Sequence, residues 1–568
     1  MQIITREVGS GSLAVDNPLV ERLYLSRGIR RIEETQKGLQ ALLSPSGLTD
    51  VEKAAERLAD ALTTNQRILI VGDYDADGAT SVALCKLALT AMGAEQVDFL
   101  VPDRFQFGYG LSLEIVALAQ SKAPDLIVTV DNGISSLEGV AAANELGIDV
   151  VITDHHLPGS ELPPAYAIVN PNRRDCEFAS KSMAGVGVAY YLMSWLRHTL
   201  RERGWFHPEQ KPEPNLGQFL DLVALGTVAD VVPLDHNNRI LVHQGLLRMR
   251  RGHTRPGIRA LVELGKRDLT QLSAQDLGFA VGPRLNAAGR LDDMSVGIRC
   301  LLADDPVDAR RLAQHLDALN RDRREIEQDM VTDAELLVAQ EPSLAQLMGI
   351  AVYNENFHQG VVGIVAGRLR EKLHRPAIVF ADGSDGSSGE IKGSARSIDG
   401  LNIRDVLDAI ATRHPGLLIK FGGHAMAAGL SIKRVHFERF RTVFDRAVAE
   451  LVDDDTLSAK CVTDGALAEQ QLTLETVQAL SSAGPWGNGF PEPAFCDEFE
   501  VISQRVVGEV HLKLVLRMGE RLVDAIAFRQ APLDADVRQL RVVYRPSRND
   551  YGQTPTLQLI VEYIEPLA

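Results

Sequence analysis

The chain has 568 residues, of which 45% are hydrophobic and 24% charged, so it can bury ordinary cores in roughly three or four domains. No run of about 18 apolar residues occurs, and the first residues lack the basic and apolar regions of a secretory signal, so we expect no membrane association. The net charge of −17 argues against a protein that coats nucleic acid regardless of sequence.

Cysteine usage and local charge narrow the class further. Five widely spaced cysteines occur without a C-x-x-C pair, which argues against a disulfide framework and a cysteine zinc site. A reducing cytoplasm is therefore the expected location. Arginines cluster at 248–259 and at 310–324, and each cluster is either part of a local basic channel or a solvated helix face.

The first half of the chain alternates between strand and helix patterns. Residues 1–50 carry little signal. Short apolar runs predict buried strands at 67–72, 97–101, 126–130 and 150–153. Helical stretches such as 135–146 separate them, and this alternation predicts a parallel sheet with helices on both faces. Ligands of such sheets bind beyond the carboxyl ends of the strands.

The second half predicts a connector and two further domains. Leucines and other apolar residues at helical spacing predict one long helix over 304–340, and a second α/β region follows with a strand at 377–380 and a flexible turn at 382–389. Alternating segments near the C-terminus predict an OB-like β-barrel, a fold that commonly holds single-stranded nucleic acid. We expect an α/β chain of five parts: an N-terminal segment (1–50), a catalytic parallel-sheet domain (51–303), a connector helix (304–342), a second α/β domain (343–452) and an OB-like domain (453–568).

Three carboxylates at alternate positions, Asp73, Asp75 and Asp77, follow the first predicted strand. Such acids repel each other unless a cation neutralises them, and hard oxygen ligands suit Mg²⁺, Mn²⁺ or Ca²⁺. A calcium EF-hand does not fit, because its twelfth position is Leu84 and a strand precedes the loop. The remaining alternative is a structural turn that caps the next helix.

More acids and histidines follow the later strands. Asp131 comes after the third strand, Asp154-His155-His156 after the fourth, and Asp230 lies in a buried-looking segment. A buried acid needs a metal ion or a cationic partner. Because the set holds Asp and His but no thiolate, it predicts two Mn²⁺ or Mg²⁺ ions. Two such ions about 3.5–4 Å apart generate hydroxide and clamp a phosphoryl group.

The order of these motifs resembles that of the DHH phosphoesterase family. DYDADG, VDNG, TDHH and GTVADVVPL look like its four motifs, and GGHAMAAG at 422–429 resembles the motif of the accompanying DHHA1 domain. The segments that are similar to the RecJ exonucleases of this family lie at 282–290, 357–364, 394–397 and 484–489. The resemblance covers roughly residues 50 to 568, and the ordered set is far more specific than any single motif.

The resemblance implies a 5′-to-3′ exonuclease that degrades single-stranded DNA to mononucleotides with two Mn²⁺ or Mg²⁺ ions in DNA repair and recombination. The implied metal ligands are Asp73, Asp75, Asp77, Asp131, His155 and Asp230. Asp154 would orient a neighbouring histidine, and His156 would contact the scissile phosphate. Relatives place a histidine where this chain has Leu69, so the resemblance does not say which of the first three acids holds which ion.

The resemblance also implies a substrate path. Its residues would be Arg104, Tyr109, Arg284, Asn286, Arg290, Ser394, Arg396, Gly422, Gly423 and His424. Arg396 suits a terminal phosphate through bidentate hydrogen bonds. Phe105, Phe107 and Tyr109 either stack on bases or belong to a core. The implied partners are single-stranded DNA, a single-strand-binding protein and a RecQ-type helicase, and a monomer would suffice for activity.

Two other functions remain open at this point. A phosphoesterase for small substrates, such as pyrophosphate or dinucleotides, would use the same metal ligands but would have no need of the long connector or the C-terminal barrel. A catalytically inactive scaffold that binds single strands would have no need of Asp75, Asp131, His155 and Asp230, all of which are present.

Overall fold

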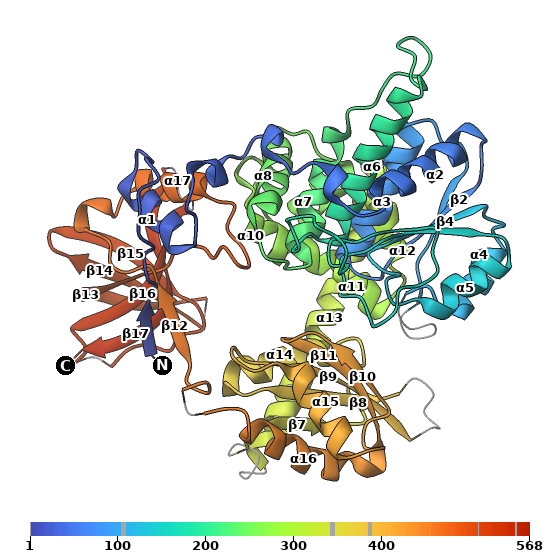
Figure 1. Cartoon of the computed structure of the whole chain (residues 1–568). Coiled ribbons are helices and arrows are strands. Elements are labelled where there is room, and N and C mark those ends of the chain that lie inside the picture. Colours follow the sequence, from blue (N-terminus) through green and yellow to red (C-terminus); the bar gives the residue numbers. More distant parts are fainter. Residues whose placement is uncertain are drawn as a thin grey trace.

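The computed structural model describes residues 2–103, 110–340, 347–383, 389–453, 455–508, 510–534, 536–550 and 554–567. Figure 1 shows three bodies: a large α/β lobe in blue and green, a smaller α/β lobe in yellow and orange, and a barrel domain in red. The long helix α13 (Pro306–Gln340) runs from the first lobe to the second, which confirms the predicted connector.

The first lobe is built on a five-stranded parallel sheet with the order β3-β2-β4-β5-β6. Its strands are β2 (Ile68–Val71), β3 (Val97–Leu100), β4 (Leu126–Val130), β5 (Asp149–Thr153) and β6 (Ala167–Val169). The helices that connect and cover them are α2 (Val51–Thr63), α3 (Ala76–Ala91), α4 (Leu113–Gln120), α5 (Leu137–Glu145) and α6 (Gly185–Glu202). Separate apolar clusters cover the two sheet faces, as predicted, whereas the three-residue strand β6 was too short to be recognised in the sequence.

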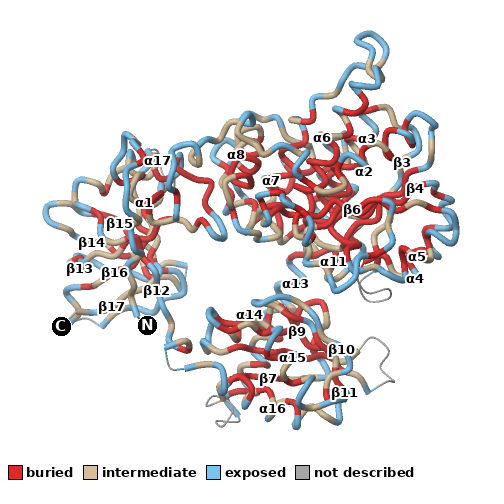
Figure 2. The backbone as a smooth tube through the Cα atoms, viewed as in Figure 1, coloured by how far each residue is buried: buried red, intermediate tan, exposed pale blue. Residues whose placement is uncertain are grey.

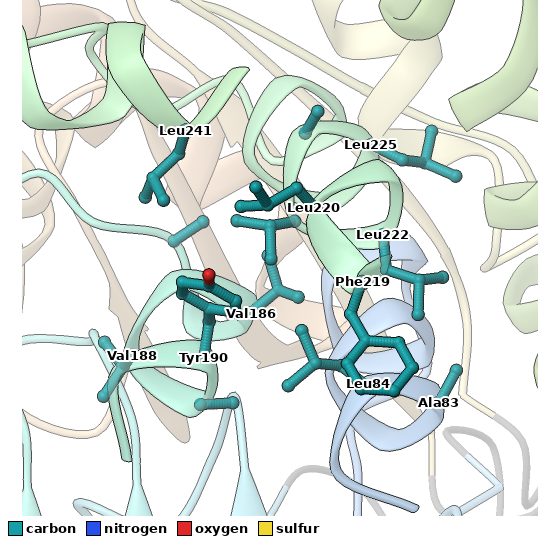
Figure 3. Close-up of a cluster of buried hydrophobic side chains, with 14 of the residues drawn as sticks. Ala83, Leu84, Val186, Val188, Tyr190, Phe219, Leu220, Leu222, Leu225 and Leu241 are labelled. Atoms are coloured by element: carbon teal, nitrogen blue, oxygen red, sulfur yellow. The ribbon is translucent and has the colours of Figure 1, made fainter. Parts of the chain in front are cut away.

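A helical layer completes this lobe. It consists of α7 (Leu220–Ala229), α8 (His236–Arg250), α9 (Pro256–Leu264), α10 (Ala274–Asp276), a π-helical turn (Leu277–Val281), α11 (Gly282–Leu291) and α12 (Ser295–Leu302). Figure 3 shows the core that joins α3, α6, α7 and α8, with Leu84, Val186 and Leu222 among the packed side chains. Figure 2 shows buried backbone throughout the interior of this lobe. The ends of α3, α6 and α7 are thereby fixed against one another.

The second lobe is a five-stranded mixed sheet with the order β10-β11-β9-β8-β7. Its strands are β7 (Ile350–Tyr353), β8 (Ala377–Asp382), β9 (Glu390–Arg396), β10 (Lys420–Gly423) and β11 (Ala427–Lys433). Only β7 and β8 run parallel, and the helices are α14 (Val362–Leu373), α15 (Ile403–Arg413) and α16 (Phe437–Ala449). Most of the turn predicted at 382–389 lies outside the described residues.

The C-terminal domain is a closed five-stranded barrel with the order β13-β14-β15-β17-β16, which confirms the predicted OB-like architecture. Its strands are β13 (Phe495–Val507), β14 (His511–Met518), β15 (Arg521–Ala527), β16 (Gln539–Asn549) and β17 (Thr556–Leu567). The helix α17 (Leu474–Ala483) precedes the barrel and packs against β16 and β17. None of the described helices is long and apolar enough to cross a membrane.

The N-terminal residues, which carried little pattern, belong structurally to the barrel domain. Strand β1 (Gln2–Thr5) pairs in parallel with β12 (Lys460–Thr463), and α1 (Pro18–Ser26) contributes Leu19 and Leu23 to the barrel core. The chain then passes through three short 3₁₀ turns to the first lobe, at Ile32–Thr35, Leu39–Ala41 and Pro45–Gly47. Pairing between segments more than 450 residues apart leaves no local signal in the sequence.

Candidate active site

Acids and histidines from four motifs meet at the carboxyl edge of the first-lobe sheet. Asp73 and Asp75 follow β2, Asp131 follows β4 and His155 follows β5, while Asp230 caps the C-terminus of α7. The His155 Nε2 atom lies 3.1 Å from Asp131 Oδ1 and 3.6 Å from Asp230 Oδ2. The sheet therefore brings together residues that are separated by up to 157 positions, as its topology predicts.

These side chains form three overlapping sets of potential metal ligands. The ligand atoms within each set lie within 4.8 Å of one another, and the sets are Asp131–His155–His156, Asp77–His155–Asp230 and Asp73–Asp75–Asp131. Asp131 and His155 each belong to two of the sets. Carboxylate oxygens with imidazole suit Mn²⁺ or Mg²⁺, and a shared carboxylate suits a pair of ions.

The electrostatics of the cluster also fit a bound cation. Burial and neighbouring carboxylates raise the pKa of Asp131 and of Asp230 well above the ordinary value, and burial together with Asp75 raises the pKa of Asp77 to about 7. Burial and the nearby His156 lower the pKa of His155 to about 4, so its imidazole is neutral at physiological pH. Neutral imidazole is the form that binds metal ions, and divalent cations would offset the repulsion among the acids.

Asp154 orients its neighbours from a fully buried position. Its Oδ1 atom accepts hydrogen bonds from the backbone amides of His155 and His156 and lies 2.8 Å from His156 Nδ1. Its Oδ2 atom accepts a hydrogen bond from the Ile134 amide. Burial alone would lower the pKa of His156, but the hydrogen bond and the charge of Asp154 raise it to about 9. The His156 ring is therefore held as a cation with its Nε2 edge directed away from Asp154.

The acidic loop after β2 is supported by α11. The Asn286 side-chain oxygen accepts a 2.7 Å hydrogen bond from the Ala76 amide. This oxygen of Asn286, a predicted substrate-binding residue, therefore holds the acidic loop. A Cβ atom on Gly289 would lie 1.7 Å from the Tyr74 carbonyl oxygen, which shows how closely the helix approaches. Asp75 caps α3 through the Gly78 amide, so the capping role considered as the alternative is present within the acidic cluster.

The start of α6 is a part of the site that the sequence did not indicate. Asp77, which is fully buried, accepts hydrogen bonds from the Gly185 amide at 2.6 Å and the Val186 amide at 2.9 Å. A Cβ atom on Gly185 would lie 2.5 Å from Asp131 Oδ1. The Gly185-Val-Gly187 sequence was the available signal, because paired glycines at the start of a helix indicate a close approach.

The second lobe faces the cluster through its glycine-rich hairpin. The rings of His156 and His424 lie 6.2 Å apart and within 19° of parallel, and Gly422 and Gly423 precede His424 at the end of β10. On strand β9, which pairs with β11, Arg396 Nη1 donates a 3.0 Å hydrogen bond to Ser394 Oγ. Burial and the nearby Arg370 lower the pKa of Arg396, so two arginines gather where the sequence indicated one.

The other predicted substrate residues are placed differently. Arg284 is buried, and its Nε atom donates a 2.8 Å hydrogen bond to Asp317, which favours a structural role. Arg290 Nη1 donates a 2.9 Å hydrogen bond to the Gly360 carbonyl and thereby links the two lobes. Arg104 and Tyr109, together with Phe105 and Phe107, lie outside the described residues.

A parallel-sheet lobe with Asp and His at its carboxyl edge, faced by a second α/β lobe with a glycine-rich hairpin, defines a phosphoesterase of the DHH class. The family models agree: "DHH family, N-terminal domain" matches residues 67–227, "DHHA1 domain" matches 345–450 and "RecJ OB domain" matches 463–563.

Curated relatives narrow the class to one family. The chain is 54% identical to the single-stranded-DNA-specific exonuclease RecJ of Dickeya dadantii and 52% identical to that of Escherichia coli, in each case over 97% of this chain and 96% of the relative. The crystal structure of RecJ from Thermus thermophilus in complex with Mn²⁺ matches with a TM-score of 0.82 at 30% identity, over 100% of this chain and 80% of that one. The chain belongs to the RecJ family of single-stranded-DNA-specific exonucleases.

Proposed function

We propose that this chain is a divalent-metal-dependent exonuclease that hydrolyses single-stranded DNA from the 5′ end to mononucleotides. One observation carries the proposal: the Asp and His cluster of the first lobe lies opposite His424 of the second lobe, with Arg396 nearby on the same sheet. A phosphodiester and a terminal phosphate could then be held at the same time. The near full-length similarity to RecJ exonucleases supports the choice of a polymer substrate over a small one.

The proposed ligands are those that meet at the sheet edge: Asp73, Asp75, Asp131, His155 and Asp230. When bound there, two Mn²⁺ or Mg²⁺ ions would supply a hydroxide nucleophile and neutralise charge on the phosphoryl group. Asp131, which belongs to two ligand sets, would serve both ions. Asp77 first anchors α6, because the Gly185 and Val186 amides engage its oxygens, and any contact with a metal ion would be additional.

The remaining active-site residues act on the substrate. Asp154 holds His156 through Nδ1, and the protonated ring donates to the scissile phosphate from Nε2. In the second lobe Arg396, Ser394 and the amides of Gly422 and Gly423 bind the terminal 5′-phosphate, and the forked guanidinium of Arg396 suits such a phosphate. The His424 ring stacks at 6.2 Å from the His156 ring and so brings the second lobe to the metal cluster. Arg370, whose Nε atom is buried without a hydrogen-bond partner among the described residues, joins them.

The cellular setting is proposed on the family alone. The enzyme would work in the cytoplasm in DNA repair and recombination, as a monomer, together with a single-strand-binding protein and a RecQ-type helicase. Arg104 and Tyr109 stay predicted contacts with the strand, while Arg284, Asn286 and Arg290 are assigned mainly to holding the loops and lobes around the metal cluster.

Digestion of an oligonucleotide labelled in turn at each end tests the proposal. The expected result is release of mononucleotides from the 5′ end of the single strand, absence of cleavage of the blunt duplex, and loss of all activity with chelator. The Asp131→Ala variant should lose cleavage while retaining strand binding. Turnover of pyrophosphate or dinucleotides without digestion of DNA would instead identify a small-substrate phosphoesterase, and strand binding without any turnover would identify a scaffold.

A further inference from the structure

The segment that carries Asp230 leaves α7 in a strained conformation. Val231, the next residue, has a φ angle of 61°, which β-branched residues rarely adopt. Such a conformation persists only where the surroundings hold it. Residue Val231 is 63% exposed, so contacts of its own side chain do not account for this conformation. Something outside residue 231 must therefore fix the backbone next to Asp230.

A loop of the C-terminal domain makes that contact. We call residues 484–490, which contain the Gly-Pro-Trp-Gly-Asn-Gly motif, the clamp loop. Within it, Asn488 Nδ2 donates a 2.7 Å hydrogen bond to the Val231 carbonyl oxygen. The Leu234 amide donates a 2.7 Å hydrogen bond to the Asn488 carbonyl oxygen. One residue of the clamp loop thus holds both ends of the segment 231–234.

The glycines of the clamp loop allow this close approach. A Cβ atom on Gly487 would lie 2.7 Å from Leu234 Cδ1, and one on Gly489 would lie 3.1 Å from Pro233 Cβ. Gly489 also has a φ angle of 68°, in the region that favours glycine. The motif therefore provides a surface without side chains on either side of Asn488, and this surface fits against residues 233 and 234.

The clamp loop is itself firmly held. The rings of Trp486 and Phe490 stack at 5.0 Å, and Trp486 Nε1 donates to the Leu480 carbonyl at the end of α17. The Arg239 guanidinium of α8 lies 4.3 Å from the Phe490 ring centroid and donates a 3.0 Å hydrogen bond to the Leu234 carbonyl. The same arginine therefore binds both the clamp loop and the segment that the loop holds.

The first lobe supports the segment from within. Asn238 Nδ2, fully buried, donates to the Pro233 carbonyl at 2.9 Å and to the Ser182 carbonyl at 2.7 Å. Val231 itself makes one backbone bond within the first lobe, in which its amide donates to the Val228 carbonyl at 3.2 Å. The Val231 carbonyl is held by Asn488 of the C-terminal domain.

We propose that Asn488 is a positioning residue for the metal centre, which acts by holding Val231 so that the Asp230 carboxylate faces His155. The inference rests on the proposed role of Asp230 as a metal ligand. It makes the C-terminal domain a structural part of the catalytic centre in addition to any contact that it makes with the strand. Metal affinity should then depend on a residue that touches neither metal nor DNA.

The test is Mn²⁺ binding by the full-length chain, measured without DNA from the electron paramagnetic resonance signal of free Mn²⁺. Asn488→Ala should weaken binding about tenfold, the lower range for residues that support ligands. Asn488→Asp keeps the size but removes the donor to Val231, and should weaken binding as much. In nuclease assays the loss of kcat should be recovered at saturating Mn²⁺, with KM for the strand unchanged.

Two further variants separate positioning from general stability. Gln275→Ala removes a contact with Glu492 at the same domain interface without touching residues 231–234, and should leave Mn²⁺ binding unchanged. Val231→Gly adopts the left-handed conformation without strain, so adding Asn488→Ala to it should weaken binding less than in the native chain. Native Mn²⁺ affinity in folded Asn488→Ala or Asn488→Asp would overturn the proposal, as would an equal loss in Gln275→Ala. Because no DNA is present, this outcome is independent of whether the chain cleaves single strands.

Discussion

Gly185 provides a way to disturb the metal centre without changing any ligand. A Cβ atom at this position would lie 2.5 Å from Asp131 Oδ1 and 2.7 Å from Asp131 Cβ, whereas ordinary contacts begin at 3.4 Å. Gly185→Ala must therefore move the Asp131 carboxylate or the start of α6 by about 0.9 Å. A misplacement of about 1 Å at a reacting centre costs on the order of 100-fold in rate. We expect kcat to fall by about that factor.

The matched control is Gly187→Ala on the same helix. Its Cβ atom would meet the flexible end of Met183 at 3.2 Å and would otherwise make ordinary contacts, at 3.8 Å to Met183 Cβ and 4.0 Å to Leu241 Cδ1. Both substitutions replace glycine by alanine within the first turn of helix α6. The assay is release of 5′-labelled nucleotides from a single strand at fixed Mn²⁺, with thermal unfolding to check the fold. If Gly185→Ala and Gly187→Ala had equal kcat, the close approach of α6 to Asp131 would not control the position of the Asp131 carboxylate.

Three further predictions concern other parts of the chain. Burial and mutual repulsion raise the pKa values of Asp131, Asp230 and Asp77, so the free energy of unfolding of the metal-free protein should fall as the pH rises from about 4 through about 7. In urea unfolding, Asp131→Asn should make this fall with pH less steep. An equally steep fall in the variant would contradict the raised pKa of Asp131. Arg396→Ala should raise KM about ten- to hundredfold for strands with a 5′-phosphate but little for 5′-hydroxyl strands, and equal losses would indicate a general backbone contact. Asp464→Ala breaks the buried Arg27–Asp464 pair and should lower the free energy of unfolding by about 3–5 kcal/mol. Glu500→Gln breaks the exposed Arg517–Glu500 pair and should lower it by less than about 1 kcal/mol. Similar losses in the two variants would show that burial does not set the cost.

Local patterns in the sequence predicted most of the fold. The parallel sheet follows from apolar runs such as 126–130, the connector from a long helical stripe, and the barrel from alternating segments such as 557–563. The parallel topology also explains why Asp131 and His155 could be expected to meet. These features depend on periodicity and on strand order, both of which can be read along the chain.

The features that escaped prediction all depend on contacts between distant segments. The pairing of β1 with β12, the approach of Gly185 to Asp131 and the bonds between Asn488 and Val231 leave no periodic trace. The resemblance places Arg284 on the path of the strand, and in the structure its Nε atom pairs with Asp317. Charge alone does not reveal whether a partner lies inside the protein or outside it.

We propose that Asp131 and its neighbours hold two divalent ions at the edge of the first-lobe sheet. Anomalous diffraction from crystals soaked with Mn²⁺ tests it most directly. We expect two peaks about 3.5–4 Å apart, both within coordination distance of Asp131, with His155 and Asp230 at one of them. A single peak, or peaks that Asp131 does not contact, would rule out a two-ion site at Asp131.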